Sequence, residues 1–188
     1  PHDLGLPITT PTRQAACVTM QEYFRRYAYL AGMTGTASPV RGELRNVYEL
    51  KVATIPTHRP SRRVAWPTRI FRTYGQRSQA VAQSIELLRS GGRCTLVGTP
   101  SVEASEAMSL ALSEHGIPHE VLNAKSHAAE AEIVASAGQP GRVTIATNMA
   151  GRGTDIHLHD DVRAAGGLHV FLTEMHSAGR IDRQLIGR

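Results

Sequence analysis

Apolar residues follow two different spacings along residues 68–185, and the two spacings alternate. Short continuous apolar runs predict buried strands, whereas apolar positions three and four residues apart predict amphipathic helices. In residues 76–90, for example, Val81, Ile85 and Leu88 share one helical face, and Gly91-Gly92 ends the helix. The predicted strands are residues 68–73, 94–97, 120–122, 143–146 and 168–172, and the predicted helices are residues 76–90, 101–116, 127–137 and 177–185.

This alternation of strands and helices with short connections predicts an α/β fold, in which a parallel β-sheet carries helices on both faces. In such sheets, ligands bind beyond the carboxyl ends of the strands. Three predicted connections lie at such ends: residues 99–101, 123–126 and 146–156. We therefore expect the chemistry of this domain to lie in these loops.

Residues 1–60 are less regular. Residues 1–12 contain three prolines and three threonines and are expected to be an extended linker. Thr19-Met20-Gln21-Glu22 has the spacing of a capping box, which predicts a helix to about Leu30, and a second short helix is expected at residues 43–50. Thr34-Gly35-Thr36 has the composition of a turn with local side-chain hydrogen bonds.

The loop at residues 146–156 has the sequence Ala-Thr-Asn-Met-Ala-Gly-Arg-Gly-Thr-Asp-Ile and is the most informative stretch of the chain. Gly151 and Gly153 free the backbone on either side of Arg152, so this loop can approach a ligand closely. The guanidinium of Arg152 suits phosphate oxygens, and the carboxylate of Asp155 can accept hydrogen bonds from sugar hydroxyls. The alternative is a glycine-rich turn with a solvated arginine, because short glycine patterns are common.

Composition sets limits on the class of protein. The chain has 188 residues, of which 41% are hydrophobic, enough for a core in one domain or one domain plus part of another. No apolar run approaches the ~20 residues of a membrane helix. Cys17 and Cys94 form no Cys-x-x-Cys pair, which argues against a zinc site. His157 and His159 form the densest histidine cluster, but we expect a polar surface turn there and no metal site.

The net charge of +5 comes almost entirely from arginine. Residues 51–85 contain no acidic residue but six arginines, which we call the arginine block: Arg59, Arg62, Arg63, Arg69, Arg72 and Arg77. Such a block could contact nucleic acid, anionic lipid or an acidic protein face, or it could be a solvated surface. No interleaving of aromatic and basic residues indicates single-strand binding.

Two elements of a complete nucleotide hydrolase are missing from the sequence. The sequence has two lysines, Lys51 and Lys125, and neither lies in a Gly-x-x-x-x-Gly-Lys-Ser/Thr phosphate-binding loop. No strand is followed by an Asp-Glu pair that could hold Mg²⁺ and orient water. Arg152 and Asp155 would form only half of a nucleotide site, so hydrolysis by this chain alone should be negligible.

Residues 146–156 resemble the fifth motif of the superfamily 2 motor ATPases. Their sequence is most similar to that motif in the SecA family of protein-export motors. The similarity continues through Thr-Met-Gln-Glu-Tyr-Phe-Arg-Arg at residues 19–26 and Leu-Ala-Gly-Met-Thr-Gly-Thr-Ala at residues 30–37. It also includes Gly-Gly-Leu-His at residues 166–169 and Arg-Ile-Asp-Arg-Gln-Leu-Ile-Gly-Arg at residues 180–188. These segments follow the family order along nearly the whole chain.

The resemblance implies two RecA-like halves with ATP and Mg²⁺ between them, the Mg²⁺ being held by the first half. Residues 1–12 would leave an inserted preprotein-binding domain, residues 13–56 would be the tail of the first half, and residues 57–188 would be the second half. Thr34, Gly35 and Thr36 would belong to the third motif, which couples hydrolysis to domain movement. The implied ATP contacts are Gly151, Arg152, Gly153, Asp155, Gln184 and Arg188. The sequence ends within the sixth motif, so we expect it to be a piece of a longer ATPase.

The resemblance also implies partners: the first motor half, the Sec channel, an unfolded preprotein and, for the whole protein, a second copy. It implies a cytoplasmic protein at the inner face of the membrane, where anionic lipid is a further possible contact, and it makes nucleic acid an unexpected partner. Glu174-Met175-His176-Ser177-Ala178-Gly179-Arg180 and Ile186 depart from the usual family pattern, and the segment between Ile156 and Gly166 is shorter. These departures suggest a divergent paralogue. The alternatives are the C-terminal half of a nucleic-acid helicase and a non-catalytic regulatory module.

Overall fold

The computed structural model describes residues 16–122, 130–147, 155–176 and 178–187. The chain divides into two compact units, Pro1–Ile55 and Pro56–Arg188. In the described part of the first unit, the helices are α1 (Met20–Phe24), the 3₁₀ turn η2 (Ser38–Val40) and α2 (Arg41–Tyr48). None of these helices has a buried residue.

The helix predicted from Thr19 to about Leu30 is much shorter in the structure. The hydroxyl of Thr19 caps it by accepting a hydrogen bond from the N–H of Glu22, as the capping-box spacing predicted. However, α1 ends at Phe24, and the prediction of its far end was wrong. Tyr23 in α1 and Tyr27 beyond its end are both exposed, and their hydroxyl oxygens are hydrogen-bonded at 3.0 Å. A short helix with no buried residue gains little stability from packing, which is the main source of helical stability in proteins.

The described residues of the second unit form a four-stranded sheet in the order β2-β3-β1-β4, and every pair of neighbours is parallel. The strands are β1 (Thr95–Thr99), β2 (Glu120–Leu122), β3 (Val143–Thr147) and β4 (His169–Leu172). The helices of this unit are α3 (Tyr74–Ser90), α4 (Val102–Glu114), α5 (Glu130–Ser136), α6 (Asp160–Ala164) and α7 (Gly179–Ile186).

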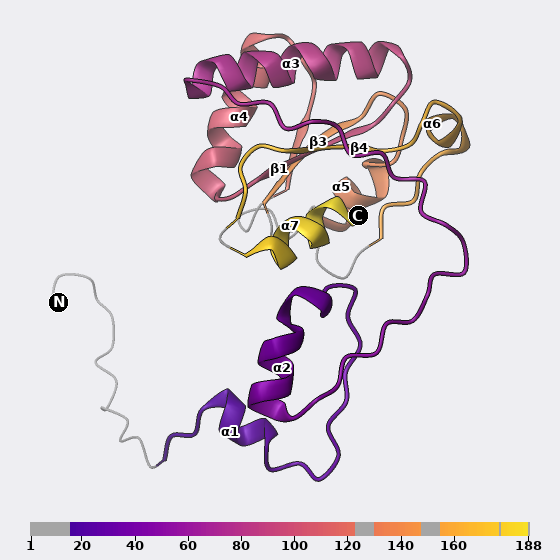
Figure 1. Cartoon of the computed structure of the whole chain (residues 1–188). Helices are drawn as coiled ribbons and strands as arrows, with labels where there is room; N and C mark the ends of the chain where they lie inside the picture. The colour runs from indigo at the N-terminus through magenta and orange to yellow at the C-terminus, as the bar shows by residue number, and fades with distance from the viewer. Residues whose placement is uncertain (1–15, 123–129, 148–154, 177, 188) are drawn as a thin grey trace, which may run out of the picture. The chain divides into compact units, whose positions relative to one another are not determined.

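Helices cover both faces of this sheet (Figure 1), so the predicted α/β architecture is confirmed. On one face, α3 and α4 pack against Val97 of β1 and Ile145 of β3. On the opposite face, α5 and α7 pack against Leu96 of β1 and Ala146 of β3. Neighbouring residues of a strand point to opposite faces, and β1 and β3 are buried at every position because both faces are covered.

The strand predicted at residues 68–73 is absent, and this prediction was wrong. These residues form no strand, and the side chain of Ile70 is 93% exposed. The guanidinium of Arg69 instead lies over the ring of Phe71, 5.2 Å from its centroid. β-branched and aromatic residues favour a strand only where a neighbouring strand and a packed face exist. Residues 68–73 have the composition of a strand without the backbone pairing.

Helix α6 was not foreseen, since residues 157–161 were expected to be a polar turn. His159 caps this helix, and its Nδ1 accepts a hydrogen bond from the N–H of Asp161. Asp160 and Asp161 lie in the first turn, where negative charge is favourable. The acidic pair after a polar residue was therefore a helix-start signal that the sequence analysis missed.

Candidate functional site

Because the four strands are parallel, their carboxyl ends meet at one edge of the sheet (Figure 1). Thr99 ends β1, Thr147 ends β3, and the two residues are register partners in the ladder. Leu172 ends β4 on the other side of β1. This arrangement gathers the segments that follow the strands, and it is where an open parallel sheet binds ligands. We call it the carboxyl edge.

The first segment at the carboxyl edge leads from β1 into α4. Ser101 caps α4, and its hydroxyl accepts a hydrogen bond of 3.1 Å from the N–H of Ala104. The hydroxyl of Thr99 is buried and makes longer contacts of 3.5 Å with the carbonyls of Ser101 and Ala146. Hydrogen bonds of the Ser101 and Thr99 hydroxyls therefore hold the turn between β1 and α4.

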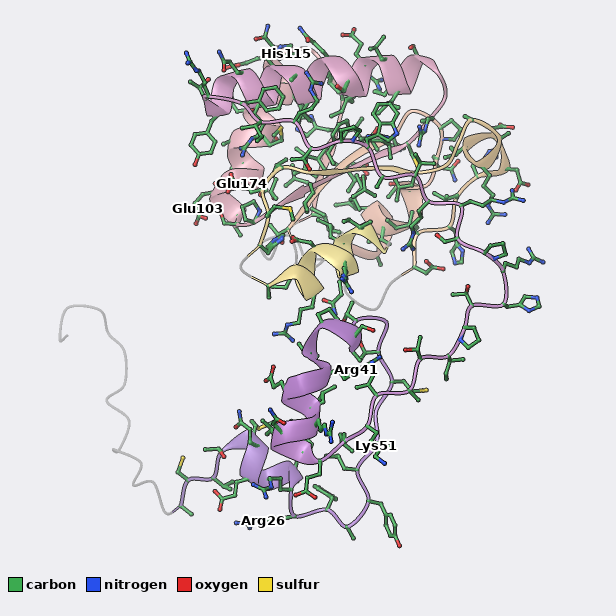
Figure 2. The ribbon with its side chains drawn as sticks, viewed as in Figure 1. Arg26, Arg41, Lys51, Glu103, His115 and Glu174 are labelled. Carbon is green, nitrogen blue, oxygen red and sulfur yellow. The ribbon has the colours of Figure 1, made fainter. Side chains whose placement is uncertain are left out.

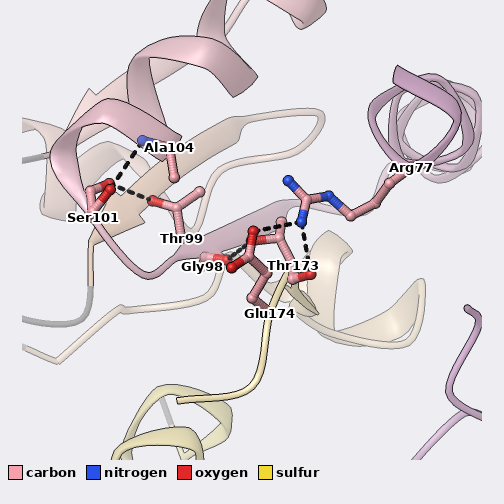
Figure 3. Close-up of polar contacts among 7 residues, drawn as sticks. All are labelled: Arg77, Gly98, Thr99, Ser101, Ala104, Thr173 and Glu174. Carbon is pink, nitrogen blue, oxygen red and sulfur yellow. Dashed lines mark hydrogen bonds and ion pairs between the residues drawn. The ribbon is translucent and has the colours of Figure 1, made fainter. Parts of the chain in front are cut away.

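An ion pair joins α3 to the segment that follows β4 (Figure 3). Nη1 of Arg77 lies 2.7 Å from Oε1 of Glu174 and donates a second, longer bond of 3.3 Å to the carbonyl of Thr173. Its guanidinium also lies over the ring of Tyr74, 4.8 Å from the centroid. Thr173 in turn binds the carbonyl of Gly98 through both its N–H and its hydroxyl. Glu174 is thereby fixed at the carboxyl edge, where Figure 2 shows it beside the sheet.

Arg77 belongs to the arginine block, and no pattern in the sequence indicated this ion pair. Arg63 also has a specific contact, because its Nη2 donates to the carbonyl of Gly187 at 2.9 Å. Arg59, Arg62 and Arg72 are exposed. No local pattern distinguishes these arginines, since Arg77 and Glu174 are 97 residues apart. The block is thus partly structural and partly free surface.

Helix α7 reaches the carboxyl edge from the other face of the sheet. Its buried residues are Asp182 and Leu185, and the side chain of Leu185 packs against Gly98 of β1. Asp182 accepts hydrogen bonds from His176, which lies between β4 and α7. Gln184 lies on the exposed side of the same helix. Gln184 is one of the ATP contacts that the resemblance implies. It lies on α7, which packs against the sheet at the carboxyl edge.

The other predicted contacts are distributed differently. Asp155 is exposed, comes shortly before α6 and forms no hydrogen bond to another described residue. Gly151, Arg152, Gly153 and Arg188 lie outside the described residues, so their roles stay predictions.

Thr34, Gly35 and Thr36 belong to the first unit. The hydroxyl of Thr34 accepts from the N–H of Thr36, and the two hydroxyls are 3.2 Å apart. The predicted turn with local side-chain bonds is confirmed, and its coupling role stays a prediction.

Among the described residues of the second unit, two titratable groups have altered pKa values. Burial raises the pKa of the Cys94 thiol to about 11, which keeps it protonated and unreactive. Burial, assisted by the positive charge of Arg93, lowers the pKa of His169. Neither group lies at the carboxyl edge, since Cys94 precedes β1 and His169 begins β4. In the part of the chain that the structure describes, no group of three or more His, Cys, Asp or Glu residues could hold a metal ion.

A parallel sheet with helices on both faces is an α/β architecture, and the family match reported next makes it an α/β domain of the RecA-like class. Two family models match the chain: the SecA P-loop domain over residues 60–164 and the SecA DEAD-like domain over residues 3–45. The chain belongs to the SecA family. The sequence nevertheless contains no phosphate-binding Gly-Lys-Ser/Thr loop of its own.

Named relatives are similar along almost the whole chain. A protein translocase subunit SecA 2 of Rhodopirellula baltica is 53% identical over 98% of this chain and 28% of its own length. A protein translocase subunit SecA of Nitratidesulfovibrio vulgaris is 52% identical over 98% of this chain and 22% of its own length. A SecA subunit of Bacteroides fragilis is also 52% identical, with 17% of its length covered. The chain spans about a quarter or less of these relatives.

Proposed function

We propose that this chain is part of an ATP-driven motor that moves unfolded preproteins through the Sec channel. The observation that carries the proposal is the 53% identity over 98% of the chain to a protein named as a translocase subunit. In this proposal, residues 57–188 are the second motor half and residues 13–56 are the tail of the first. Residues 1–12 are the linker from a preprotein-binding domain.

The second motor half contributes contacts to ATP. Asp155 accepts hydrogen bonds from the ribose, Arg152 pairs with phosphate, and Gly151 and Gly153 let the backbone come close. Gln184 contributes from α7, and Arg188 contributes from the sequence two positions after the last residue of that helix. The exposed carboxylate of Asp155, which no described residue engages, fits this role.

ATP supplies the phosphoryl bond whose cleavage drives movement, and Mg²⁺ neutralises the phosphate charge. We assign the ion to the first motor half, as the resemblance to the SecA family implies. Thr34, Gly35 and Thr36 couple hydrolysis to domain movement. Because the sequence has no phosphate-binding loop, this chain alone should not hydrolyse ATP.

The proposed partners are the first motor half, the Sec channel, an unfolded preprotein and a second copy of the whole protein. We place the whole protein in the cytoplasm, at the inner face of the membrane, with the exposed Arg59, Arg62 and Arg72 available to anionic lipid. Among the helices that the structure describes, none has the length and apolar character needed to cross a bilayer. Nucleic acid is not an expected partner.

The decisive measurement is ATP turnover by the full-length protein, with an unfolded preprotein and separately with single-stranded RNA. This chain by itself is the blank. Stimulation by the preprotein alone supports the translocation motor. Stimulation by RNA alone would reject it in favour of a nucleic-acid helicase and would direct attention to the arginine block.

The site assignment is tested with Asp155→Ala in the full-length protein. We expect the KM for ATP to rise about 10-fold, the cost of a lost charged hydrogen bond, while the melting temperature stays unchanged. Asp160→Ala is the matched control, because it removes another exposed carboxylate from the same region. A loss of cooperative melting in Asp155→Ala, with no change in KM, would indicate a structural role instead.

A further inference from the structure

A buried pair of polar side chains, His176 and Asp182, ties the start of α7 to the segment that follows β4. Oδ1 of Asp182 lies 2.6 Å from Nδ1 of His176 and accepts a second bond of 3.1 Å from the N–H of His176. Both side chains are 6% exposed. One carboxylate oxygen therefore holds both the backbone and the ring of the residue that leads into the helix.

Helix α7 has a weak beginning without this pair. Its N-cap, Ala178, has no side chain that could bind the free N–H groups, and its first residue is Gly179, a poor helix former. In a capping box, a side chain of the first turn reaches back to the backbone before the helix. Asp182 does the same over a longer distance, since it reaches His176, six residues earlier. The pair thus anchors the start of α7 to the segment before it, although it binds none of the free N–H groups of the helix.

The same pair fixes the rotation of α7 about its axis. Asp182 and Leu185 are three residues apart, so they lie on one face of the helix, and both are buried. Asp182 is held by His176, and Leu185 packs against Gly98 of β1. With two points on one face anchored, Gln184 is directed to the exposed side.

Stability alone does not explain a histidine at this position. Nδ1–H donates to Asp182, which leaves Nε2 as the second polar atom of the ring. Nε2 is buried and has no hydrogen-bond partner among the described residues. A buried polar atom without a partner costs free energy, and an apolar side chain would avoid that cost. What the histidine adds is the directed bond to Asp182.

We propose that His176 and Asp182 are positioning residues of the nucleotide site, acting as a clamp that sets the orientation of α7 and of Gln184. This inference rests on the proposed function, because it assigns the clamp to the ATP site. The clamp does not touch ATP itself. It holds α7, the helix that carries the proposed ATP contact Gln184. Loss of the clamp should therefore change how productively ATP is bound.

The test compares His176→Ala with His176→Asn in the full-length protein, by measuring kcat and KM for ATP. Asparagine places an N–H donor near the position of Nδ1 but has no counterpart of Nε2. We expect His176→Ala to lower kcat/KM about 10-fold, since small displacements of positioning groups are costly, and His176→Asn to recover most of it. Recovery through the asparagine amide is the signature of the clamp.

His119→Ala is the matched control. His119 also makes two hydrogen bonds, to Ser109 and to the carbonyl of Ile117, but it lies before the start of β2 rather than at the carboxyl edge. The substitution His119→Ala should lower the melting temperature of the protein without changing kcat/KM for ATP. If His176→Ala behaves in the same way, or if His176→Asn is as defective as His176→Ala while still folded, the clamp is rejected.

Asp155→Ala separates this inference from the proposed function. If Asp155→Ala raises the KM for ATP and His176→Ala changes neither kcat nor KM, only the clamp fails. If neither variant affects ATP turnover by a folded protein, the assignment of the nucleotide site fails as well.

Discussion

The side chain of Leu185 on α7 occupies the space that a Cβ atom on Gly98 of β1 would need. A Cβ built at residue 98 would overlap Cδ2 of Leu185 and lie 3.1 Å from its Cγ. Both residues lie in the interior, and Leu185 is 2% exposed. A glycine inside a central strand is explained by such a close approach. It lets α7 lie directly on the sheet beside the carboxyl edge.

Gly98→Ala should therefore destabilise the fold. We expect a loss of about 1–3 kcal/mol in the free energy of unfolding, the usual cost of adding a methyl group to a packed interior. Urea unfolding followed by circular dichroism measures it. Gly75→Ala in α3 is the control, because a Cβ there meets no atom within 4 Å, and it should be neutral or stabilising. An unchanged stability in Gly98→Ala would mean that α7 does not pack here in solution.

The Arg77–Glu174 ion pair should contribute measurably to stability. Its side chains are 18% and 38% exposed, and the arginine also donates to a carbonyl, so the pair is partly shielded from solvent. We expect a coupling energy of about 1 kcal/mol in a double-mutant cycle of Arg77→Ala and Glu174→Ala.

A more exposed pair provides the comparison for this cycle. Arg163 and Asp160 are 3.5 Å apart with side chains 63% and 93% exposed, so their coupling should be near zero. Equal coupling in the two pairs would show that the shielding of Arg77 has no energetic consequence.

His169 should make the second unit less stable in acid. Burial and the positive charge of Arg93 lower the pKa of His169 in the folded state, so the unfolded chain binds the proton more readily. The effect is absent well above pH 6.5, and stability is lost as the pH falls below 6.5 towards the lowered folded pKa. His169→Phe should flatten the decline in the free energy of unfolding between pH 7 and pH 5.

The ring of Trp66 allows the same step to be followed directly. It is the only tryptophan and lies 5.4 Å from the ring of His169. Its emission should therefore change as His169 titrates, and NMR of the imidazole should give a pKa below 6.5. The exposed His58 is the control position. His58→Phe should leave the decline in the free energy of unfolding between pH 7 and pH 5 unchanged. A normal pKa for His169 would contradict the burial seen here.

The sequence predicted the repeating elements because the patterns that mark them are local in the sequence. Apolar spacing located the helices α3 and α4, and short apolar runs located β1 to β4. Local signals failed where a partner decides the outcome. Residues 68–73 had strand composition but form no backbone ladder, and α1 ends at Phe24 although its amphipathic pattern continues.

For the site, the sequence by itself determined the candidate chemistry. The glycines around Arg152, the position of Asp155 and the order of the family segments can all be read along the chain, as can the absence of a phosphate-binding loop. Only the tertiary structure decided which distant residues meet. Arg77 joins Glu174, and Leu185 covers Gly98, across 97 and 87 positions of the sequence. Such pairs depend on the packing of whole elements, for which no local pattern of residues carries a signal.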